Sequence, residues 1–146
     1  MVKKTTYEIR IVKVGSVHED PSQEIITQPD HILPFLKDIR NHDQEHFVCA
    51  TLNGNGKIIT VRVITIGLLN HSLVHPREVF KGAILDNAAS VIVAHNHPSG
   101  SLEASNQDIA ITTQLKEAGN ILGISVLDHI IVTKESYVSM REKGLM

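Results

Sequence analysis

Residues 91–108 read Val-Ile-Val-Ala-His-Asn-His-Pro-Ser-Gly-Ser-Leu-Glu-Ala-Ser-Asn-Gln-Asp. The apolar start predicts a short buried strand that ends at His95 and His97, and the Pro/Gly-rich turn after it leads into a helix. Side chains alternate along an extended chain, so both histidines point one way and Asn96 points the other. Asp108 follows eleven residues after His97. Two imidazoles and a carboxylate at a strand end predict a three-ligand site for a divalent metal, zinc.

The same residues also allow a structural interpretation. Ser105 and Asp108 have the spacing of a capping box, in which the serine accepts from the backbone and the acid reaches back to the cap residue. The helix dipole also favours an acid in the first turn. Spacing alone does not choose between cap and ligand. The two roles are compatible, because Ser105 can cap the helix while Asp108 faces a metal.

A three-ligand zinc site is typical of catalysis, because the fourth tetrahedral position is left for water. Zinc lowers the pKa of such a water toward about 7. A hydrolase then needs a carboxylate that takes the proton of the water and passes it to the leaving group. Glu45, at the head of a predicted strand, and Glu78, early in a predicted helix, are both candidates. Their positions alone do not decide between them.

Length and composition predict one soluble globular domain. A chain of 146 residues buries roughly 68–70% of its unfolded surface. Its single cysteine, Cys49, lies in an apolar run, which indicates a buried core residue rather than a reactive thiol and fits the reducing cytoplasm. Residues 1–7 do not resemble a signal peptide, and no run approaches the ~18 apolar residues of a membrane span. We therefore expect a cytoplasmic protein with no membrane association.

Hydrophobic periodicity predicts strands alternating with helices. The expected strands span residues 5–14, 45–52, 57–66, 90–95, 124–132 and 137–140, and the expected helices span residues 31–40, 76–87 and 105–118. Between the first strand and the first helix, a polar segment to Pro29 reads as a loop or arm. Residues 53–56, Asn-Gly-Asn-Gly, predict a hairpin turn. This order indicates the α/β class, with a mixed β-sheet and helices on its faces.

The helix boundaries rest on particular residues. Asp30 is a candidate N-cap for the first helix, with Pro34 tolerated near its first turn. Pro76 suits the first position of the second helix, and Gly119 suits the end of the third. The apolar face of the first helix comprises Ile32, Leu33, Phe35, Leu36 and Ile39, and the buried stripe expected on the second comprises Val79, Phe80, Ala83, Ile84 and Leu85.

The metal-site residues carry a family resemblance. His95-x-His97, seven residues, Ser105, two residues and Asp108 match the signature His-x-His-x7-Ser-x2-Asp, so the chain resembles the JAB/MPN metal-dependent proteases with their JAMM motif. Three segments are similar to the RadC branch of that family: Ser-Leu-Val-His-Pro-Arg-Glu at 72–78, His-Asn-His-Pro-Ser-Gly at 95–100 and Leu-Asp-His-Ile-Ile-Val at 127–132. The resemblance covers about residues 30–142. Asn96, often Ser or Thr in the wider family, follows the RadC form.

The resemblance implies a JAB/MPN metalloprotease-like single domain over residues 30–146 and roles for its residues. His95, His97 and Asp108 would bind zinc. The catalytic glutamate of the family opens a hairpin strand ahead of the metal motif, and Glu45 stands at that place, so Glu78 is better interpreted as a first-turn acid. Ser105 would help to hold the oxyanion of the tetrahedral intermediate. The implied function is a zinc metallopeptidase-like hydrolase, in which activated water attacks a peptide or isopeptide amide.

Three further residues are expected to support the ligands or line the cleft. They are Asn96, Ser99 and His129. His129 lies in a buried-looking strand, where it is either a structural histidine or a partner of the site, with a hydrogen bond to a neighbour such as Asp128.

Two other functions compete with hydrolysis. The history of the RadC family suggests a DNA-repair or nucleic-acid-processing accessory protein, and a dead MPN-like domain would act as an interaction scaffold. RadC proteins commonly carry a helical DNA-binding-like segment before this domain, whereas residues 1–29 are expected to form only a strand and a polar arm. A net charge of −2 and 3% aromatic residues offer no general attraction to nucleic acid. The expected partner is a protein or peptide substrate, and exposed strand edges at 5–14 and 137–140 suit a homo-oligomer.

Overall fold

The computed structural model describes residues 25–67 and 74–146 of the chain. Its strands are β1 (Glu45–Leu52), β2 (Ile58–Gly67), β3 (Ser90–Asn96), β4 (Ser125–Val132) and β5 (Tyr137–Ser139). They form one sheet in the order β2-β1-β3-β4-β5. β3 and β4 are parallel, and the other neighbouring pairs are antiparallel. The prediction of a mixed sheet in a single α/β domain is confirmed. The strand expected at 5–14 lies outside the described residues.

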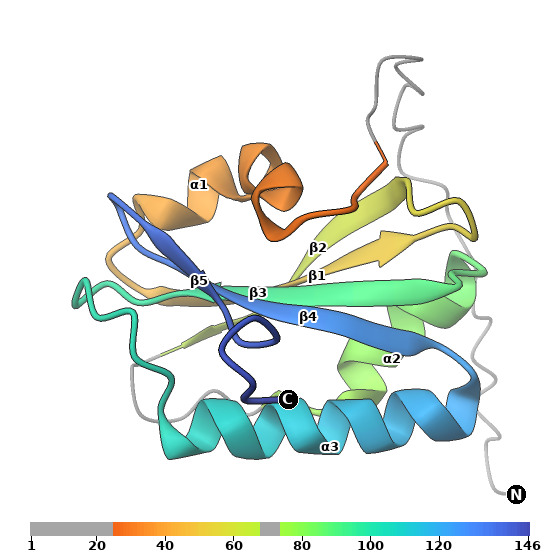
Figure 1. The fold of residues 1–146 in the computed structure, drawn as a ribbon. Coiled ribbons are helices and arrows are strands. Elements are labelled where there is room, and N and C mark those ends of the chain that lie inside the picture. The colour runs from red at the N-terminus through yellow and green to blue at the C-terminus, as the bar shows by residue number, and fades with distance from the viewer. Residues whose placement is uncertain (1–24, 68–73) are drawn as a thin grey trace, which may run out of the picture.

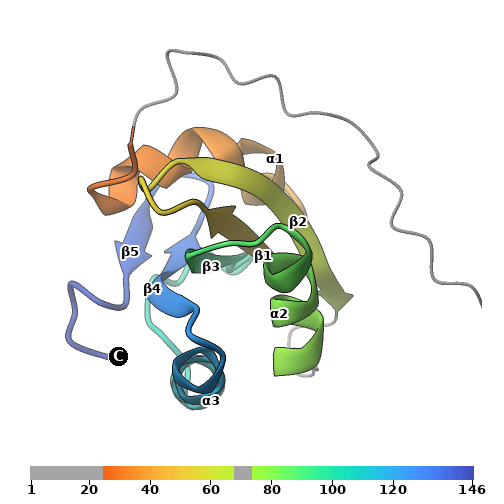
Figure 2. The ribbon, with the colours of Figure 1, turned by 90° about the vertical axis from the view of Figure 1, so that its right-hand side faces the viewer.

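Helices cover both faces of the sheet. The 3-10 helix η1 (Pro29–Leu36) runs into the short α1 (Lys37–Arg40) on one face, and α2 (Pro76–Leu85) and α3 (Asn106–Leu122) lie on the other. Figures 1 and 2 show these three layers from two directions. Within the described residues, no helix is long and apolar enough to cross a bilayer.

The first helix differs from the prediction at its start and in its winding. It begins at Pro29, so Asp30 lies in the first turn, and the N-cap residue Gln28 makes no side-chain cap bond. Most of the segment is 3-10 rather than α-helical. Pro34 explains this, because it has no N–H and its ring collides with the carbonyl four residues earlier in an α-helix. Pro29 suits the start, where a missing N–H costs nothing.

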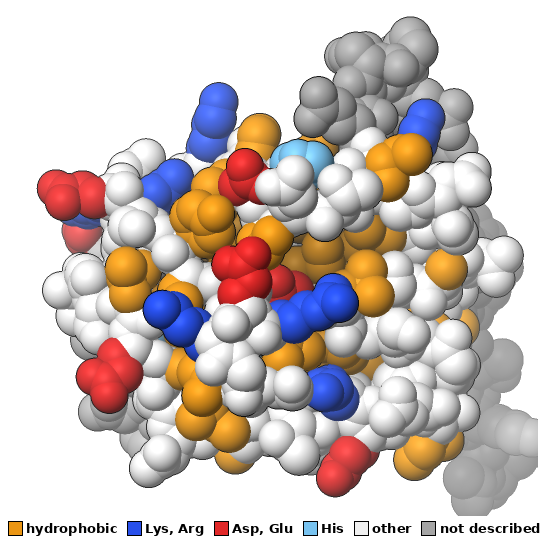
Figure 3. Space-filling view, viewed as in Figure 1, with side chains coloured by type: hydrophobic (Ala, Val, Ile, Leu, Met, Phe, Trp, Pro, Cys, Tyr) orange, Lys and Arg blue, Asp and Glu red, His pale blue; other side chains and the backbone are white. Residues whose placement is uncertain are grey.

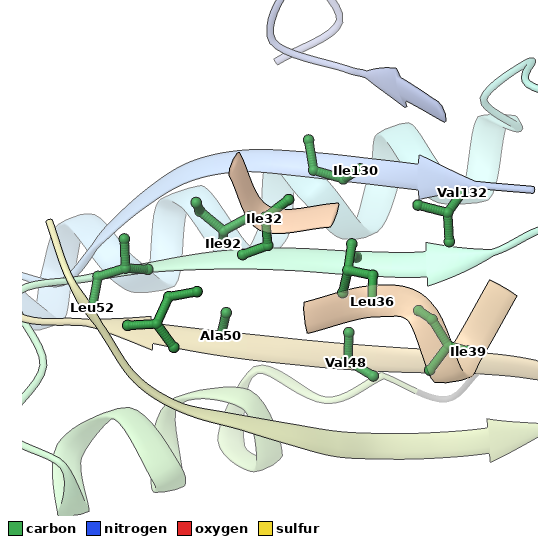
Figure 4. Packing of buried hydrophobic residues seen from close by; sticks show 11 residues of the cluster. Ile32, Leu36, Ile39, Val48, Ala50, Leu52, Ile92, Ile130 and Val132 are labelled. Atoms are coloured by element: carbon green, nitrogen blue, oxygen red, sulfur yellow. The ribbon is translucent and has the colours of Figure 1, made fainter. Parts of the chain in front are cut away.

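The helical segment η1–α1 is held to the sheet by one hydrophobic cluster, shown in Figure 4. Alternation along the strands sends to this face residues 48, 50 and 52 of β1, residues 92 and 94 of β3, and residues 130 and 132 of β4. Their odd-numbered neighbours face α2 and α3. The cluster comprises Ile32, Leu36, Ile39, Val48, Ala50, Leu52, Ile58, Ile92, Ala94, Ile130 and Val132. Each large side chain buried here contributes roughly 1.5–3 kcal/mol, so the register of the three central strands is strongly determined.

A second cluster fills the space between the sheet and α2 and α3. Val79, Phe80 and Ala83 from α2 and Leu115 from α3 are buried in it. The predicted stripe was wrong for the last two residues of α2, since Ile84 is 57% and Leu85 51% exposed. The prediction for Cys49 is confirmed, because it is buried in this cluster and burial raises its thiol pKa to about 12.

The end of α3 also differs from the prediction. Gly119 does not stop the helix, which continues to Leu122 and ends at Gly123 with a left-handed φ of 70°. Gly119 is buried instead, at a point where a Cβ atom would lie 2.3 Å from the carbonyl oxygen of Ile124. A close approach between helix and chain therefore explains this glycine. Packing, not helix termination, determines its place.

Candidate metal centre

Three side chains converge where β3 ends and α3 begins, and Figure 1 shows the loop that joins these two elements. His95, His97 and Asp108 each offer one atom to a group whose atoms lie within 4.8 Å of one another. The two histidine Nε2 atoms are 2.8 Å apart. Each lies near one carboxylate oxygen of Asp108, at 3.2 Å for His95 and 3.3 Å for His97. Two imidazole nitrogens and a carboxylate oxygen suit zinc or a related divalent ion.

The backbone explains why the two histidines share a face. The ladder between β3 and β4 continues past the strand end, where the backbone N–H of His97 donates to Val132 at 2.9 Å. Residues 95 and 97 therefore remain in extended register. A turn follows, in which the N–H of Gly100 donates to the carbonyl of His97 and Gly100 has a φ of 83°. This left-handed conformation favours glycine.

Asp108 takes part in a complete capping box. Its backbone N–H donates to Ser105 Oγ at 3.1 Å, and its Oδ2 accepts from the Ser105 N–H at 2.8 Å. The same carboxylate lies beside both histidines, so cap and candidate ligand coexist in one side chain. Burial raises the pKa of Asp108, but the contacts with His95 and His97 outweigh it and hold this pKa well below its usual range.

The Nδ1 atoms of both candidate ligands also have hydrogen-bond partners. Nδ1 of His97 donates to the carbonyl of Ser101 at 2.8 Å, and Nδ1 of His95 lies 2.7 Å from Nε2 of His129. Both rings therefore turn Nε2 toward Asp108. The hydrogen bond to Asp108 raises the pKa of His97, and the partial burial of the ring opposes this rise.

His129 lies against the candidate ligand His95, and the expected hydrogen bond between its ring and Asp128 is not present. The carboxylate of Asp128 accepts from the backbone N–H of His129, at 2.7 Å, and makes no hydrogen bond to its ring. The imidazole itself lies between His95 and Thr112, whose hydroxyl is 2.6 Å from Nδ1. Adjacent residues of a strand face opposite sides of the sheet, so the side chain of Asp128 cannot follow the ring of His129. Burial lowers the pKa of His129 well below its usual range.

Sequence reasoning missed two residues of this cluster. Thr112 lies one helical turn after Asp108, a spacing that places both on one face of α3. Phe47 pairs with His95 across β1 and β3. Its ring stacks on His95 at a centroid distance of 6.0 Å and meets His129 edge-on at 5.5 Å. The signal for Phe47 was its place two residues after Glu45, on the same face of a strand.

Glu45 opens β1 beside the ligand group. Its Oε1 lies 3.8 Å from Nε2 of His95, and its side chain is 11% exposed. Burial raises the pKa of Glu45, while the neighbouring imidazoles of His95 and His97 oppose the rise. Glu78 is exposed in the first turn of α2, where it lines a groove with Ile121 of α3. The structure thus brings Glu45 to the histidines and places Glu78 in a different surface groove.

Asn96 lies between the two histidines in sequence but acts on the opposite face of the sheet. Its Oδ1 accepts from the backbone N–H of His46 at 2.6 Å, and its Nδ2 donates to the carbonyls of His42 and Gln44 at 3.2 and 3.0 Å. Asn96 is 1% exposed. It therefore fastens the segment 42–46, which carries Glu45, to the strand that carries His95.

The two serines occupy different positions. Ser105 Oγ accepts the cap bond, and among the described residues its own proton has no hydrogen-bond acceptor. Ser99 is exposed in the turn after His97, where its Oγ accepts from the Ser101 N–H at 3.3 Å. Ser99 therefore helps to fix Ser101, whose carbonyl accepts from His97, and makes no direct hydrogen bond to the candidate ligands.

A separate cavity of about 370 Å³ lies on the η1 face. Asp128, Arg141 and Glu142 line it, together with Ile92 and Ile130. Figure 3 views the molecule from the direction of Figure 1 and shows acidic and basic side chains beside hydrophobic ones near the centre. None of the candidate metal ligands lines this cavity.

The sheet topology and the His-x-His…Asp cluster at the end of β3 define a JAB-type domain. A family profile described as the RadC-like JAB domain matches residues 26–145. The chain belongs to this RadC family.

Several relatives carry the name UPF0758 protein. The one from Methanospirillum hungatei is 57% identical over 123 residues, which cover 83% of this chain and 55% of the relative. The one from Rubrobacter xylanophilus is 48% identical over 132 residues, which cover 90% of this chain and 58% of the relative. UPF0758 protein YsxA from Bacillus subtilis is 45% identical over 139 residues, covering 92% and 60%. The chain thus spans somewhat more than half the length of these curated relatives.

Proposed function

We propose that this chain is a zinc-dependent hydrolase that cleaves a peptide or isopeptide amide. The observation that carries the proposal is the position of Glu45, whose carboxylate lies 3.8 Å from the buried nitrogen that His95 turns toward His97 and Asp108. His95, His97 and Asp108 would hold the zinc. A metal group with an adjacent, partly buried carboxylate has the parts that hydrolysis requires.

Zinc bound there would supply a Lewis acid that lowers the pKa of water toward about 7 and polarises a carbonyl. Glu45 accepts a proton from the water as its oxygen attacks the carbonyl carbon. Glu45 then delivers that proton to the nitrogen as the C–N bond breaks, which yields a carboxylic acid and an amine. A base that must return its proton is helped by a pKa above the ordinary carboxyl value, and burial moves the pKa of Glu45 in that direction.

We infer that Ser105 assists the reaction with the proton of its hydroxyl. Its Oγ already accepts from the Asp108 N–H, which fixes the oxygen at the start of α3. The remaining O–H donates to the carbonyl oxygen of the substrate as negative charge develops there. Removal of a single donor of this kind costs about 10²–10³ in kcat in other enzymes.

A cleavage screen tests this function. The full chain is loaded with zinc and incubated with peptide, isopeptide and nucleic-acid substrates, then treated with a chelator and reloaded. We expect amide cleavage that disappears with the chelator and returns with zinc. Glu45→Gln should abolish it, and Glu78→Gln, at an exposed acid, should retain it. Cleavage of nucleic acid alone, or full activity in Glu45→Gln, would overturn the proposal.

A further inference from the structure

A buried series of hydrogen bonds connects the candidate ligand His95 to the backbone of the candidate ligand Asp108. Nδ1 of His95 is 2.7 Å from Nε2 of His129. Nδ1 of His129 is 2.6 Å from Oγ1 of Thr112, and this hydroxyl is 2.6 Å from the carbonyl oxygen of Asp108. His95, His129 and Thr112 are each 0% exposed. The series closes a loop, because the carboxylate of Asp108 returns to Nε2 of His95.

The carbonyl of Asp108, the last member of the series, determines which atoms donate and which accept. The carbonyl oxygen of Asp108 can only accept, so the single hydroxyl proton of Thr112 lies between the two oxygens. The second neighbour of this hydroxyl, the sulfur of Met140 at 3.7 Å, is also only an acceptor. With its proton committed, Oγ1 of Thr112 must accept from the ring of His129. Nδ1 of His129 therefore carries hydrogen.

The state of His129 then fixes the state of His95. The ring nitrogens of His129 contact an imidazole and a hydroxyl, and neither partner is an anion that would stabilise a buried cation. A neutral ring with hydrogen on Nδ1 has a lone pair on Nε2. That lone pair accepts from Nδ1–H of His95. The lone pair of a neutral His95 then lies on Nε2, which faces His97 and Asp108.

We propose that His129, held by Thr112, is a positioning residue that fixes His95 in the tautomer that presents Nε2 to a metal. The proposal rests on the metal role of His95 proposed above. His97 obtains the same tautomer from a simpler partner, the carbonyl of Ser101. Both imidazoles thus turn Nε2 toward the same point beside Asp108 without a bound metal. Phe47 stands edge-on to His129, and the dry surroundings strengthen these bonds.

The proton positions are measured directly by NMR. The full chain is labelled with ¹⁵N-histidine, and long-range ¹H–¹⁵N spectra are recorded after removal of metal by a chelator. We expect hydrogen on Nδ1 of His95 and on Nδ1 of His129, with a coupling across the hydrogen bond from His95 to Nε2 of His129. Hydrogen found on Nε2 of His129 would overturn the proposal.

A matched set of threonine variants measures the consequence for the metal. Thr112→Val removes the hydroxyl but keeps the shape, Thr112→Ser restores it, and Thr113→Val removes an exposed hydroxyl with a similar bond to a carbonyl one turn earlier. Competition with a chromogenic chelator should show zinc affinity about 10–100-fold lower in Thr112→Val. The visible spectrum of the cobalt-loaded variant should also change. Thr112→Ser and Thr113→Val should match the unchanged protein.

Zinc binding by Thr112→Val as tight as that by Thr112→Ser would contradict the positioning role. If Thr112→Val does not fold, the NMR spectrum of the unchanged protein still decides the proposal. Neither measurement uses a substrate, so an absence of amide cleavage would overturn the hydrolase and leave this inference standing. Conversely, an active enzyme whose His129 carries hydrogen on Nε2 would overturn only the inference.

Discussion

The side-chain oxygen of Asn96 lies 2.6 Å from the backbone nitrogen of His46. Asn96 and its two neighbours in sequence therefore connect the candidate metal ligands to the segment that carries the candidate base. His95 and His97 turn one way as candidate ligands, and Asn96 turns the other way to grip the segment that carries Glu45. One strand end thereby determines how far the candidate base stands from the candidate metal.

Replacement of Asn96 tests whether its hydrogen bonds fix the segment that carries Glu45. Asn96→Ala leaves the buried N–H of His46 without its partner, which should lower the free energy of unfolding by about 1–3 kcal/mol. Cleavage should fall further than this stability loss explains, because Glu45 is no longer fixed. Asn96→Asp keeps the acceptor for His46 but turns a second carboxylate oxygen toward the carbonyls of His42 and Gln44, so it should destabilise the fold at least as much in urea unfolding. Unchanged stability in Asn96→Ala would refute the role assigned to the amide.

Local rules predicted the part of the site that lies within one stretch of chain. Alternation along β3 was sufficient to bring His95 and His97 together, and the helix start after the turn accounted for Asp108. Glu45 came from the family resemblance, because its approach depends on the pairing of β1 with β3, which no local pattern contains. Thr112 stayed hidden for the same reason, since a threonine within a helix has no distinctive pattern.

The errors in the fold arose where tertiary contacts override local preference. Glycine is a good helix terminator, yet Gly119 is needed inside α3 because the chain at Ile124 passes too close for a side chain. Leu85 and Ile84 continue an apolar pattern, yet the sheet offers them no surface at the end of α2. Sequence periodicity reports what a helix can bury, and the neighbouring elements decide what it does bury.

Gly119→Ala should therefore be strongly destabilising. A Cβ at this position would lie 2.3 Å from the Ile124 oxygen and 3.2 Å from the ring of Phe80, so backbone must move. Overpacking typically costs about 1–3 kcal/mol, although alanine is the better helix former. Gly54→Ala is the control, since nothing lies within 4 Å of a Cβ there. Thermal melts compare the two, and equal melting temperatures would show that the close approach is not rigid.

The pH dependence of cleavage tests the role of Glu45. A general base works only when deprotonated, so the rate should fall as pH decreases through the Glu45 pKa. Burial raises this pKa above the ordinary value of 4.5 in the zinc-free chain, and the charge of a bound zinc ion would oppose that rise. The profile of kcat/KM against pH gives the midpoint, with bound zinc measured at each pH to separate loss of base from loss of metal. A rate that does not fall on acidification while zinc stays fully bound, or the same profile in Glu45→Gln, would contradict this assignment.

Zinc should stabilise the folded chain, and Asp108 allows its two roles to be separated. Zinc at 100 times its Kd adds about 2.7 kcal/mol to the free energy of unfolding. Asp108→Asn keeps an oxygen that accepts from the Ser105 N–H, so the helix cap and the zinc-free melting temperature should largely persist. The neutral amide is a poor zinc ligand, so the zinc-induced rise in Tm should shrink sharply, as it should in His97→Ala. His75→Ala, at an exposed histidine before α2, should keep the full rise. A full rise in Asp108→Asn would mean that Asp108 serves the helix alone.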